Sequence, residues 1–141
     1  MTIGNARAWA YELALPPEPV SVSRARHFVG VHLVEHGLSS LADDAGLVMS
    51  EFASNAIRHA RTPFSVAVCG LVDDSVLVTV SDGSRGAPAL TKPVVLAEAG
   101  RGLWIVDHLS QDWGVESRGD GTKTLWASFV IPLVPGSSAT R

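Results

Sequence analysis

Cysteine, charge and long apolar runs are all scarce in this sequence. Cys69 is the only cysteine among 141 residues, which excludes a disulfide framework and a cysteine-based zinc site. No apolar run approaches the roughly 20 residues of a membrane-spanning helix, and the N-terminus lacks the basic and apolar regions of a signal peptide. We therefore expect a soluble cytoplasmic protein with no membrane association and a buried thiol at Cys69.

Positively charged residues do not outnumber the negatively charged ones. The chain has 11 Lys and Arg against 14 Asp and Glu, a formal net charge of −3. Without a basic stripe to neutralise phosphates, no direct nucleic-acid binding is expected. Hydrophobic residues make up 46% of the chain and charged residues 18%, which favours one well-buried globular domain. We place this single domain at residues 1–133 and a disordered tail at residues 134–141.

The spacing of apolar residues alternates along the chain between a period near two and a period of 3.6, which indicates strands and helices respectively. In chain order, the pattern predicts a strand at 8–15, a helix from Ser21 or Ser23 to Gly37, a helix at 41–60, strands at 64–71 and 75–81, a long loop at 82–100, a helix at 103–109, and strands at 113–117 and 122–132. The partial segregation of helices and strands favours an α+β fold over a doubly wound parallel sheet. We expect a two-layer sandwich, a mixed and mostly antiparallel sheet with three helices on one face.

The helix predicted at 41–60 carries a polar stripe. Glu51 and Asn55 are four residues apart, so they lie one turn apart on the same helix face. Arg58 and His59 extend this stripe, and apolar residues cover the opposite face. A base, an amide and two cationic groups would suit a metal-bound phosphate, although the same spacing is also common on a solvated helix surface.

Three later segments add polar groups that fit the same ligand. Gly100-Arg101-Gly102-Leu103 lies where the long loop meets a helix, and the unpaired N–H groups at a helix start suit a phosphate. Asp82 follows a strand and offers a carboxylate to the exocyclic amine of a purine, and Thr124 in the last strand offers a hydroxyl beside the same base. Each segment also has an ordinary explanation, as a glycine loop, an Asp-Gly turn or a β-branched strand residue.

Other common sites are not supported by the sequence. A dinucleotide fingerprint requires a third glycine where this chain has Ile105, and a P-loop requires glycine where it has Thr122. Of the histidines at 27, 32 and 36, only His32 and His36 are spaced to share a helix face, and zinc needs at least a third ligand. A structural or solvent-facing role is favoured for these histidines.

The order of the motifs resembles the GHKL (Bergerat-fold) ATP-binding domain. Glu-x-x-x-Asn on a helix is followed by Asp-x-x-x-Gly after a strand, by Gly-x-Gly-Leu opening a helix, and by Gly-Thr-x-Thr in a last strand. The resemblance spans roughly residues 24–129. The string Ser54-Asn55-Ala56-Ile57-Arg58-His59-Ala60 is most similar to the anti-sigma-factor serine kinases of the RsbW and SpoIIAB type. The resemblance implies the Bergerat fold and the binding of ATP and Mg²⁺.

The resemblance also implies a role for each matching residue. Asn55 would hold Mg²⁺ against the triphosphate, Glu51 would act as the general base, and Asp82 would bind the adenine amine. The second glycine box under the phosphates is matched by Gly100, Arg101, Gly102 and Leu103, the threonine beside adenine by Thr124, and the cationic neighbours of the phosphates by Arg58 and His59.

The first glycine box departs from the family pattern Asp-x-Gly-x-Gly. Ser84 replaces the first glycine of this pattern, whereas Gly86 supplies the second. The Cβ of serine narrows the backbone angles available at this position. This substitution bears on the geometry of the adenine loop and on nucleotide affinity.

Two functions follow from the resemblance. The first is a protein serine kinase and anti-sigma factor that phosphorylates a small antagonist protein and sequesters a sigma factor, as a homodimer with a partner surface near the first helix. The second is a nucleotide-responsive binding module that sequesters a transcription regulator without catalysis. Asn55 is required by both functions, whereas Glu51 is required only by the kinase. A histidine-kinase or chaperone fragment is disfavoured, because no dimerisation hairpin with a phosphoacceptor histidine precedes the domain.

Overall fold

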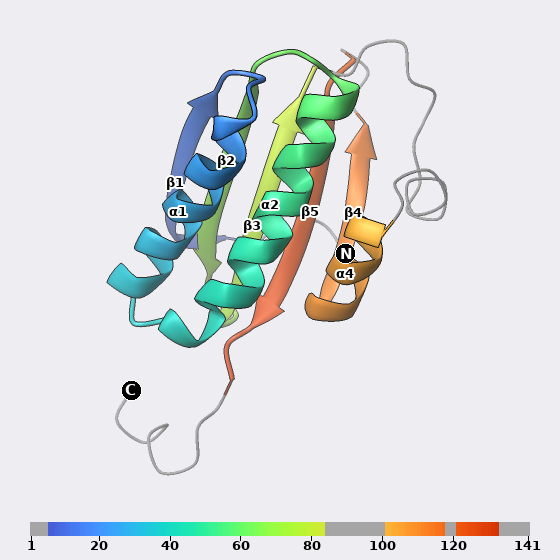
Figure 1. Cartoon of the computed structure of the whole chain (residues 1–141). Coiled ribbons are helices and arrows are strands. Elements are labelled where there is room, and N and C mark those ends of the chain that lie inside the picture. Colours follow the sequence, from blue (N-terminus) through green and yellow to red (C-terminus); the bar gives the residue numbers. More distant parts are fainter. Residues whose placement is uncertain (1–5, 84–100, 118–120, 133–141) are drawn as a thin grey trace.

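The computed structural model describes residues 6–83, 101–117 and 121–132 (Figure 1). Its elements are β1 (Arg7–Leu15), α1 (Val20–Glu35), the short 3₁₀ helix η1 (Ser39–Leu41), α2 (Ala42–His59), β2 (Phe64–Leu71), β3 (Ser75–Asp82), α4 (Arg101–Leu109), β4 (Asp112–Ser117) and β5 (Lys123–Val130). Every predicted helix and strand is present, and among the described residues η1 is the one addition. Most of the expected loop 82–100 and the expected tail 134–141 lie outside the described residues.

The five strands form one antiparallel sheet in the order β1-β2-β3-β5-β4. The predicted hairpin of β2 and β3 is confirmed, and its turn places Asp74 at a φ of +64°. Asp tolerates this left-handed conformation better than most residues. The last strand in the sequence, β5, lies between β3 and β4, so residues at the start of β5 are neighbours of residues at the end of β3.

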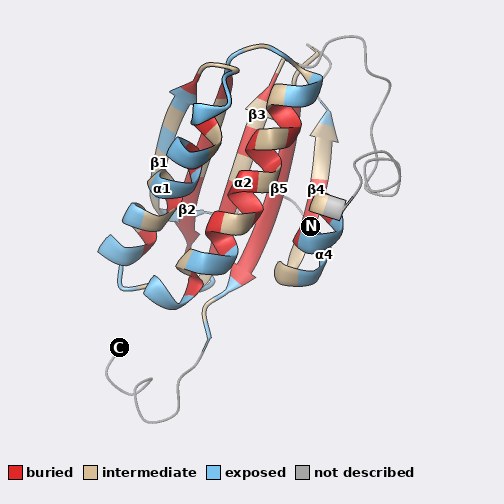
Figure 2. Ribbon diagram, in the orientation of Figure 1, coloured by how far each residue is buried: buried red, intermediate tan, exposed pale blue. Residues whose placement is uncertain are grey.

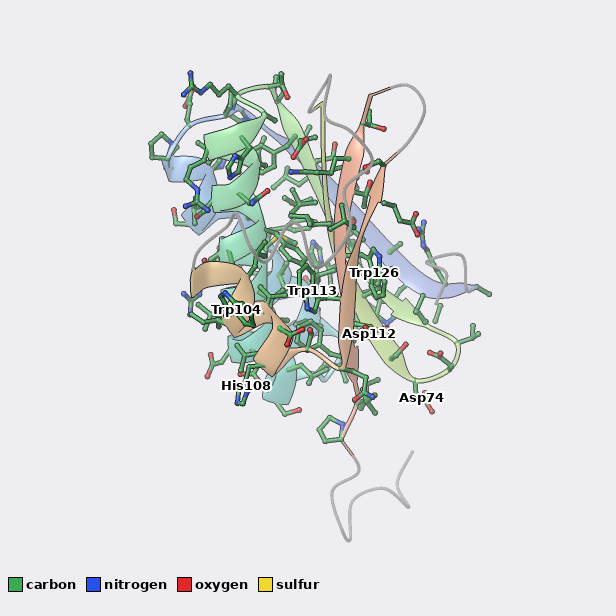
Figure 3. The ribbon with its side chains drawn as sticks, turned by 90° about the vertical axis from the view of Figure 1, so that its right-hand side faces the viewer. Asp74, Trp104, His108, Asp112, Trp113 and Trp126 are labelled. Carbon is green, nitrogen blue, oxygen red and sulfur yellow. The ribbon has the colours of Figure 1, made fainter. Side chains whose placement is uncertain are left out.

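Helices α1, α2 and α4 cover one face of the sheet (Figures 1 and 3). Apolar side chains from both layers meet in one core, where burial is concentrated on the facing sides of the helices and strands (Figure 2). Fully buried members of this core include Val29, Leu33, Val48, Met49, Phe52, Val66, Val78 and Val106. The predicted two-layer α+β fold with three helices on one face is therefore confirmed, with a sheet that is antiparallel at every described pairing.

The start of α1 differs from the prediction. Neither Ser21 nor Ser23 caps the helix, because α1 begins at Val20 and Pro19 occupies the cap position. The Ser21 hydroxyl is buried and donates a hydrogen bond of 2.7 Å to the Pro16 carbonyl, which ties the helix start to the preceding turn. Proline can begin a helix without a side-chain cap, because its φ is already helical and it has no N–H to satisfy. At the other end Gly37 follows the helix with a φ of +73°, as predicted.

Side chains of β5 alternate between the two faces of the sheet. Leu125 belongs to the core under the helices, whereas Trp126 packs on the opposite, open face with Cys69 and Leu77. Figure 3 shows this division, with Trp113 on the helix side and Trp126 on the other side. Cys69 is 4% exposed, which confirms the expected buried thiol. Burial raises the pKa of this thiol, and the nearby Arg7 guanidinium partly offsets the effect.

Replacing Gly30 with alanine is expected to stabilise the protein. Gly30 lies inside α1, and an added methyl group would meet no atom within 4 Å. Alanine restricts the unfolded chain and favours the helix by about 0.5–1 kcal/mol relative to glycine. Thermal unfolding monitored by circular dichroism should show a higher Tm.

Gly70→Ala is the matched control for the Gly30 prediction. A methyl group at Gly70 would collide with the Trp9 indole, so the same substitution should destabilise there by about 1–3 kcal/mol. A lower Tm for Gly30→Ala would contradict the described packing of α1.

Candidate functional site

Helix α2 brings the predicted polar stripe to the boundary between the two layers. Asn55 is 3% exposed, and Glu51 one turn earlier is half-buried. Phe52 and Ala56 lie in the core on the same helix, so packing of the apolar face fixes the direction of the polar face. Asn55 is therefore part of the interior, and the interpretation of this stripe as a wholly solvated surface is wrong at this position.

The ends of two neighbouring strands face Asn55. Asp82 at the end of β3 pairs in register with Lys123 at the start of β5, so their side chains share the helix-covered face. The Lys123 ammonium donates a hydrogen bond of 3.1 Å to Asn55 Oδ1, and its Nζ lies 3.8 Å from Asp82 Oδ2. All three residues are at most 5% exposed. They form a buried amide, carboxylate and ammonium group, which we call the polar triad.

Lys123 was not identified from the sequence, whereas Thr124 was. The structure corrects this placement, because Thr124 points to the open face of the sheet, where its hydroxyl lies 2.8 Å from that of Ser81. Successive side chains of a strand point to opposite faces, so Thr124 cannot join Asp82. Lys123 precedes core-facing Leu125 by two residues in the strand, so the period of two predicts that both side chains lie on the same face, and this is the signal for the lysine.

Glu51 meets the start of α4. A methyl group added to Gly102 would collide with the Glu51 carboxylate, so the missing side chain of Gly102 is what allows this contact. The first turn of α4 carries free N–H groups and the positive end of a helix dipole, which favour a nearby carboxylate. The structure thus brings together Glu51 from the helix stripe and Gly102 from the predicted glycine box.

The other predicted site residues have different positions. Leu103 is 2% exposed and packs in the core, so its side chain supports α4 and does not line the site. Arg101 is the first residue of α4, while Gly86 and Gly100 lie outside the described residues. Arg58 and His59 are both exposed at the end of α2.

A groove of about 440 Å³ runs beside the Glu51 carboxylate. Ser54, Ile57 and Arg58 of α2 form one wall, and Pro19 and Val22 at the start of α1 form the other. The groove thus combines a carboxylate, a hydroxyl and a guanidinium with an apolar wall.

The polar triad fits the adenine end and the metal end of a nucleotide. A carboxylate accepts hydrogen bonds from an amine, and an ammonium group donates to a ring nitrogen. Asn55 Oδ1 keeps a second lone pair besides the one used by Lys123, and Mg²⁺ needs few protein ligands because it retains waters and phosphate oxygens. Among the residues that the structure describes, no group of three or more His, Cys, Asp or Glu side chains could hold a metal ion.

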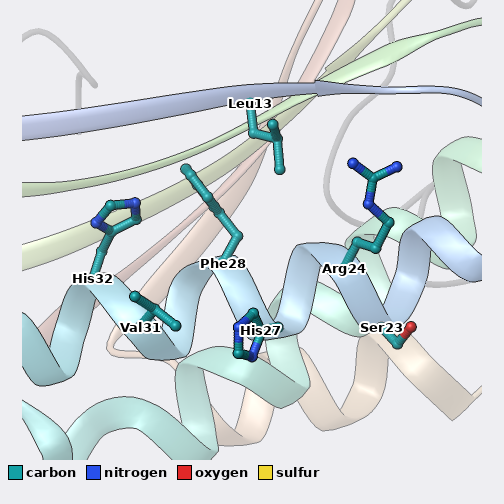
Figure 4. Close-up of a pocket in the computed structure, with 7 residues that line it drawn as sticks. All are labelled: Leu13, Ser23, Arg24, His27, Phe28, Val31 and His32. Atoms are coloured by element: carbon teal, nitrogen blue, oxygen red, sulfur yellow. The ribbon is translucent and has the colours of Figure 1, made fainter.

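A second hollow, of about 560 Å³, lies on the outer side of α1 beside β1 (Figure 4). Three apolar side chains line it, together with a hydroxyl, a guanidinium and two imidazoles: Leu13, Phe28, Val31, Ser23, Arg24, His27 and His32. Nearby, His32 stacks on Tyr11 with ring centroids 3.7 Å apart, and His36 stacks on Trp9 at 4.0 Å. These two histidines therefore pack against the aromatic residues of β1, and the hollow shares no residue with the polar triad.

The fold defines a class, the small α+β sandwich domains in which helices cover one face of an antiparallel sheet. Residues 15–129 match the family described as the histidine kinase-like ATPase domain. This match covers most of the chain, so the protein belongs to that family, and the predicted GHKL resemblance is confirmed. The family implies ATP binding.

Two solved structures have a similar fold. One is the crystal structure of the RsbU and RsbW domains of a Mycobacterium tuberculosis protein, with a TM-score of 0.67 and 21% identity over 88% of this chain. The present chain spans 33% of that chain. The other is the SiaB–SiaC complex from Pseudomonas aeruginosa, with a TM-score of 0.64, 16% identity, and coverage of 89% of this chain and 90% of that one.

No helix among the described residues is long and apolar enough to span a membrane.

Proposed function

We propose that this protein is an ATP-dependent protein serine kinase and anti-sigma factor. It would phosphorylate a small antagonist protein and sequester a sigma factor. The single observation that carries the proposal is the convergence of Glu51 and Asn55 of α2 with Gly102 of α4 and Asp82 of β3. Similarity in fold to RsbW and SiaB domains supports it.

Each of these residues would have a separate role in phosphoryl transfer. ATP supplies the phosphoryl group, and Mg²⁺ supplies charge neutralisation when both are bound. Asp82 would bind the adenine amine, Asn55 would provide a metal ligand, and the start of α4 would face the phosphates. Glu51 would accept the proton of the attacking serine hydroxyl as its oxygen bonds to phosphorus and ADP leaves. Such transfer depends mainly on positioning and electrostatics, so these few groups are sufficient.

The groove beside Glu51 offers a path for the serine of the antagonist. Arg58 at its edge is exposed and can attract an acidic segment of a partner. The apolar wall formed by Pro19, Val22 and Ile57 can hold the flanking residues of that segment. An acceptor hydroxyl would then reach the carboxylate from the side of α1.

The outer surface of α1 is the proposed site of homodimerisation or sigma-factor binding. Val31 and Val34 are 39% and 57% exposed there, next to the hollow of Figure 4. Exposed apolar side chains beside an apolar hollow are typical of a protein interface.

A non-catalytic nucleotide-responsive module is the second candidate. The observation that favours it is the hydrogen bond from Lys123 to Asn55 Oδ1, the atom that the kinase would use for Mg²⁺. A cation held at this oxygen would disfavour a second cation close by. Such a module would bind nucleotide and a transcription regulator, and it would not transfer phosphate.

Binding and turnover measured on the same protein separate these functions. Calorimetry with ATP and Mg²⁺ measures binding, and incubation with labelled ATP and a candidate antagonist measures transfer. We expect micromolar or tighter binding together with label on a serine of the antagonist. Binding without transfer would support the module, and the absence of any adenine-nucleotide binding would defeat both candidates.

A further inference from the structure

Lys123 is a buried charged residue to which the proposed function gives no role. Its side chain is 7% exposed, and that of Asp82 is 1% exposed. Burying a lysine is costly unless the charge is paired and hydrogen-bonded. The start of β5 holds this lysine at the place where Asp82 faces α2, so the site contains a fixed donor beside a fixed acceptor.

The ammonium group of Lys123 has hydrogen-bonding capacity beyond its contact with Asn55. An ammonium group has three donors, and Asn55 Oδ1 uses one of them at 3.1 Å. The distance of 3.8 Å to Asp82 Oδ2 is that of an ion pair and exceeds the usual range of an N–H···O hydrogen bond. The Lys123 ammonium therefore does not bind the Asp82 carboxylate closely, and it keeps donors for a third partner. A carboxylate has two oxygens and can accept several hydrogen bonds, so Asp82 can accept one from a ligand in addition to its contacts within the protein.

A hydrogen-bond donor beside an acceptor favours a ligand that presents an acceptor to the first and a donor to the second. The six-membered ring of adenine has such an edge, because its exocyclic amine donates and the adjacent ring nitrogen N1 accepts. The carboxylate suits the amine, and the ammonium group suits N1 with a charge-assisted hydrogen bond. A hydroxyl at this position would offer a weaker, uncharged donor.

We propose that Lys123 is a specificity-determining ligand of the nucleobase, which donates a hydrogen bond directly to adenine N1 while Asp82 accepts one from the adenine amine. This inference rests on the proposed function, since it assumes that ATP binds at the polar triad. It adds a contact made by Lys123, the position that the Gly-Thr-x-Thr motif leaves unspecified. On binding, the ammonium group exchanges part of its interaction with Asn55 and Asp82 for the base.

The wild-type protein provides the first test, which does not depend on any variant. Affinities are measured by calorimetry for ATP and for 1-deaza-ATP, in which carbon replaces N1. Loss of a hydrogen bond to a charged group corresponds to roughly 10- to 150-fold weaker binding. We expect 1-deaza-ATP to bind weaker by this factor. Equal affinities for the two nucleotides would overturn the role of Lys123.

Two substitutions then assign the donor. Lys123→Met nearly keeps the length of the side chain and removes its donors. This variant should bind ATP roughly 10- to 150-fold more weakly than the wild type does. It should also bind ATP and 1-deaza-ATP with equal affinity. Lys123→Gln keeps an N–H donor and should retain part of the discrimination, and circular dichroism checks that both variants fold. Should Lys123→Met fail to fold, Lys123→Gln and the wild-type comparison still decide.

The possible failures are distinguishable. If Lys123→Met still discriminates between the nucleotides, another group binds N1 and the proposal is wrong. If this variant binds ATP with Mg²⁺ more tightly than the wild type, Lys123 competes with the ligand and the proposal is again wrong. If the wild type binds neither nucleotide, the proposed function itself fails.

Discussion

Glu51→Gln is expected to slow phosphoryl transfer to the antagonist by about 10²- to 10⁴-fold, the usual contribution of a general base. Glutamine has nearly the shape of glutamate and cannot accept the proton of the serine hydroxyl. ATP affinity should change by no more than a few-fold, because the contacts proposed for the base involve Asp82 and Lys123 and do not include Glu51. Labelled ATP measures the transfer rate, and calorimetry measures binding separately.

Asp43→Asn is the matched control for Glu51→Gln. Asp43 lies in the first turn of the same helix α2 and is exposed. Removing its charge tests whether a general change in the electrostatics of α2 is enough to slow transfer. The general-base role of Glu51 would be refuted by transfer that survives Glu51→Gln undiminished, or by an equal loss in Asp43→Asn.

Local sequence patterns were sufficient to predict the helices and strands and the two site residues on α2, Glu51 and Asn55. The 3.6-residue spacing on α2 correctly placed Phe52 in the core, and this fixes the direction of Glu51 and Asn55 one face away. The β2–β3 hairpin was equally predictable, because the spacing of its apolar residues and the residues of its turn are both local features of the sequence. The buried state of Asn55 follows from the same pattern once a sheet covers the helix.

Contacts between distant segments could not be predicted in this way. Lys123 and Asn55 are 68 residues apart in the sequence, and they meet only because β5 inserts beside β3. The contact of Glu51 with Gly102 likewise depends on how α4 packs on α2. Thr124 fits the Gly-Thr-x-Thr motif by position, but position in a motif does not specify the face of the strand, and its hydroxyl lies on the open face beside Ser81.

Phe52→Ala is expected to cost about 3–5 kcal/mol in the free energy of unfolding. The Phe52 side chain is fully buried and is among the largest in the core. The truncation removes apolar contacts and leaves a cavity between α2 and the sheet. For a domain of this size the loss corresponds to a Tm lower by roughly 10–20 °C, and it is a large part of a typical stability of about 5–15 kcal/mol.

Trp104→Ala separates burial from the mere loss of an aromatic ring. Trp104 is 57% exposed on α4 (Figure 3), so its truncation should change stability by no more than about 0.5 kcal/mol. Urea or thermal unfolding of both variants gives the comparison. A small effect for Phe52→Ala would mean that α2 does not present this face to the sheet. Because the helix is rigid, a different orientation of α2 would also direct Glu51 and Asn55 away from the site. The stability of Phe52→Ala therefore tests the helix orientation on which the proposed chemistry depends.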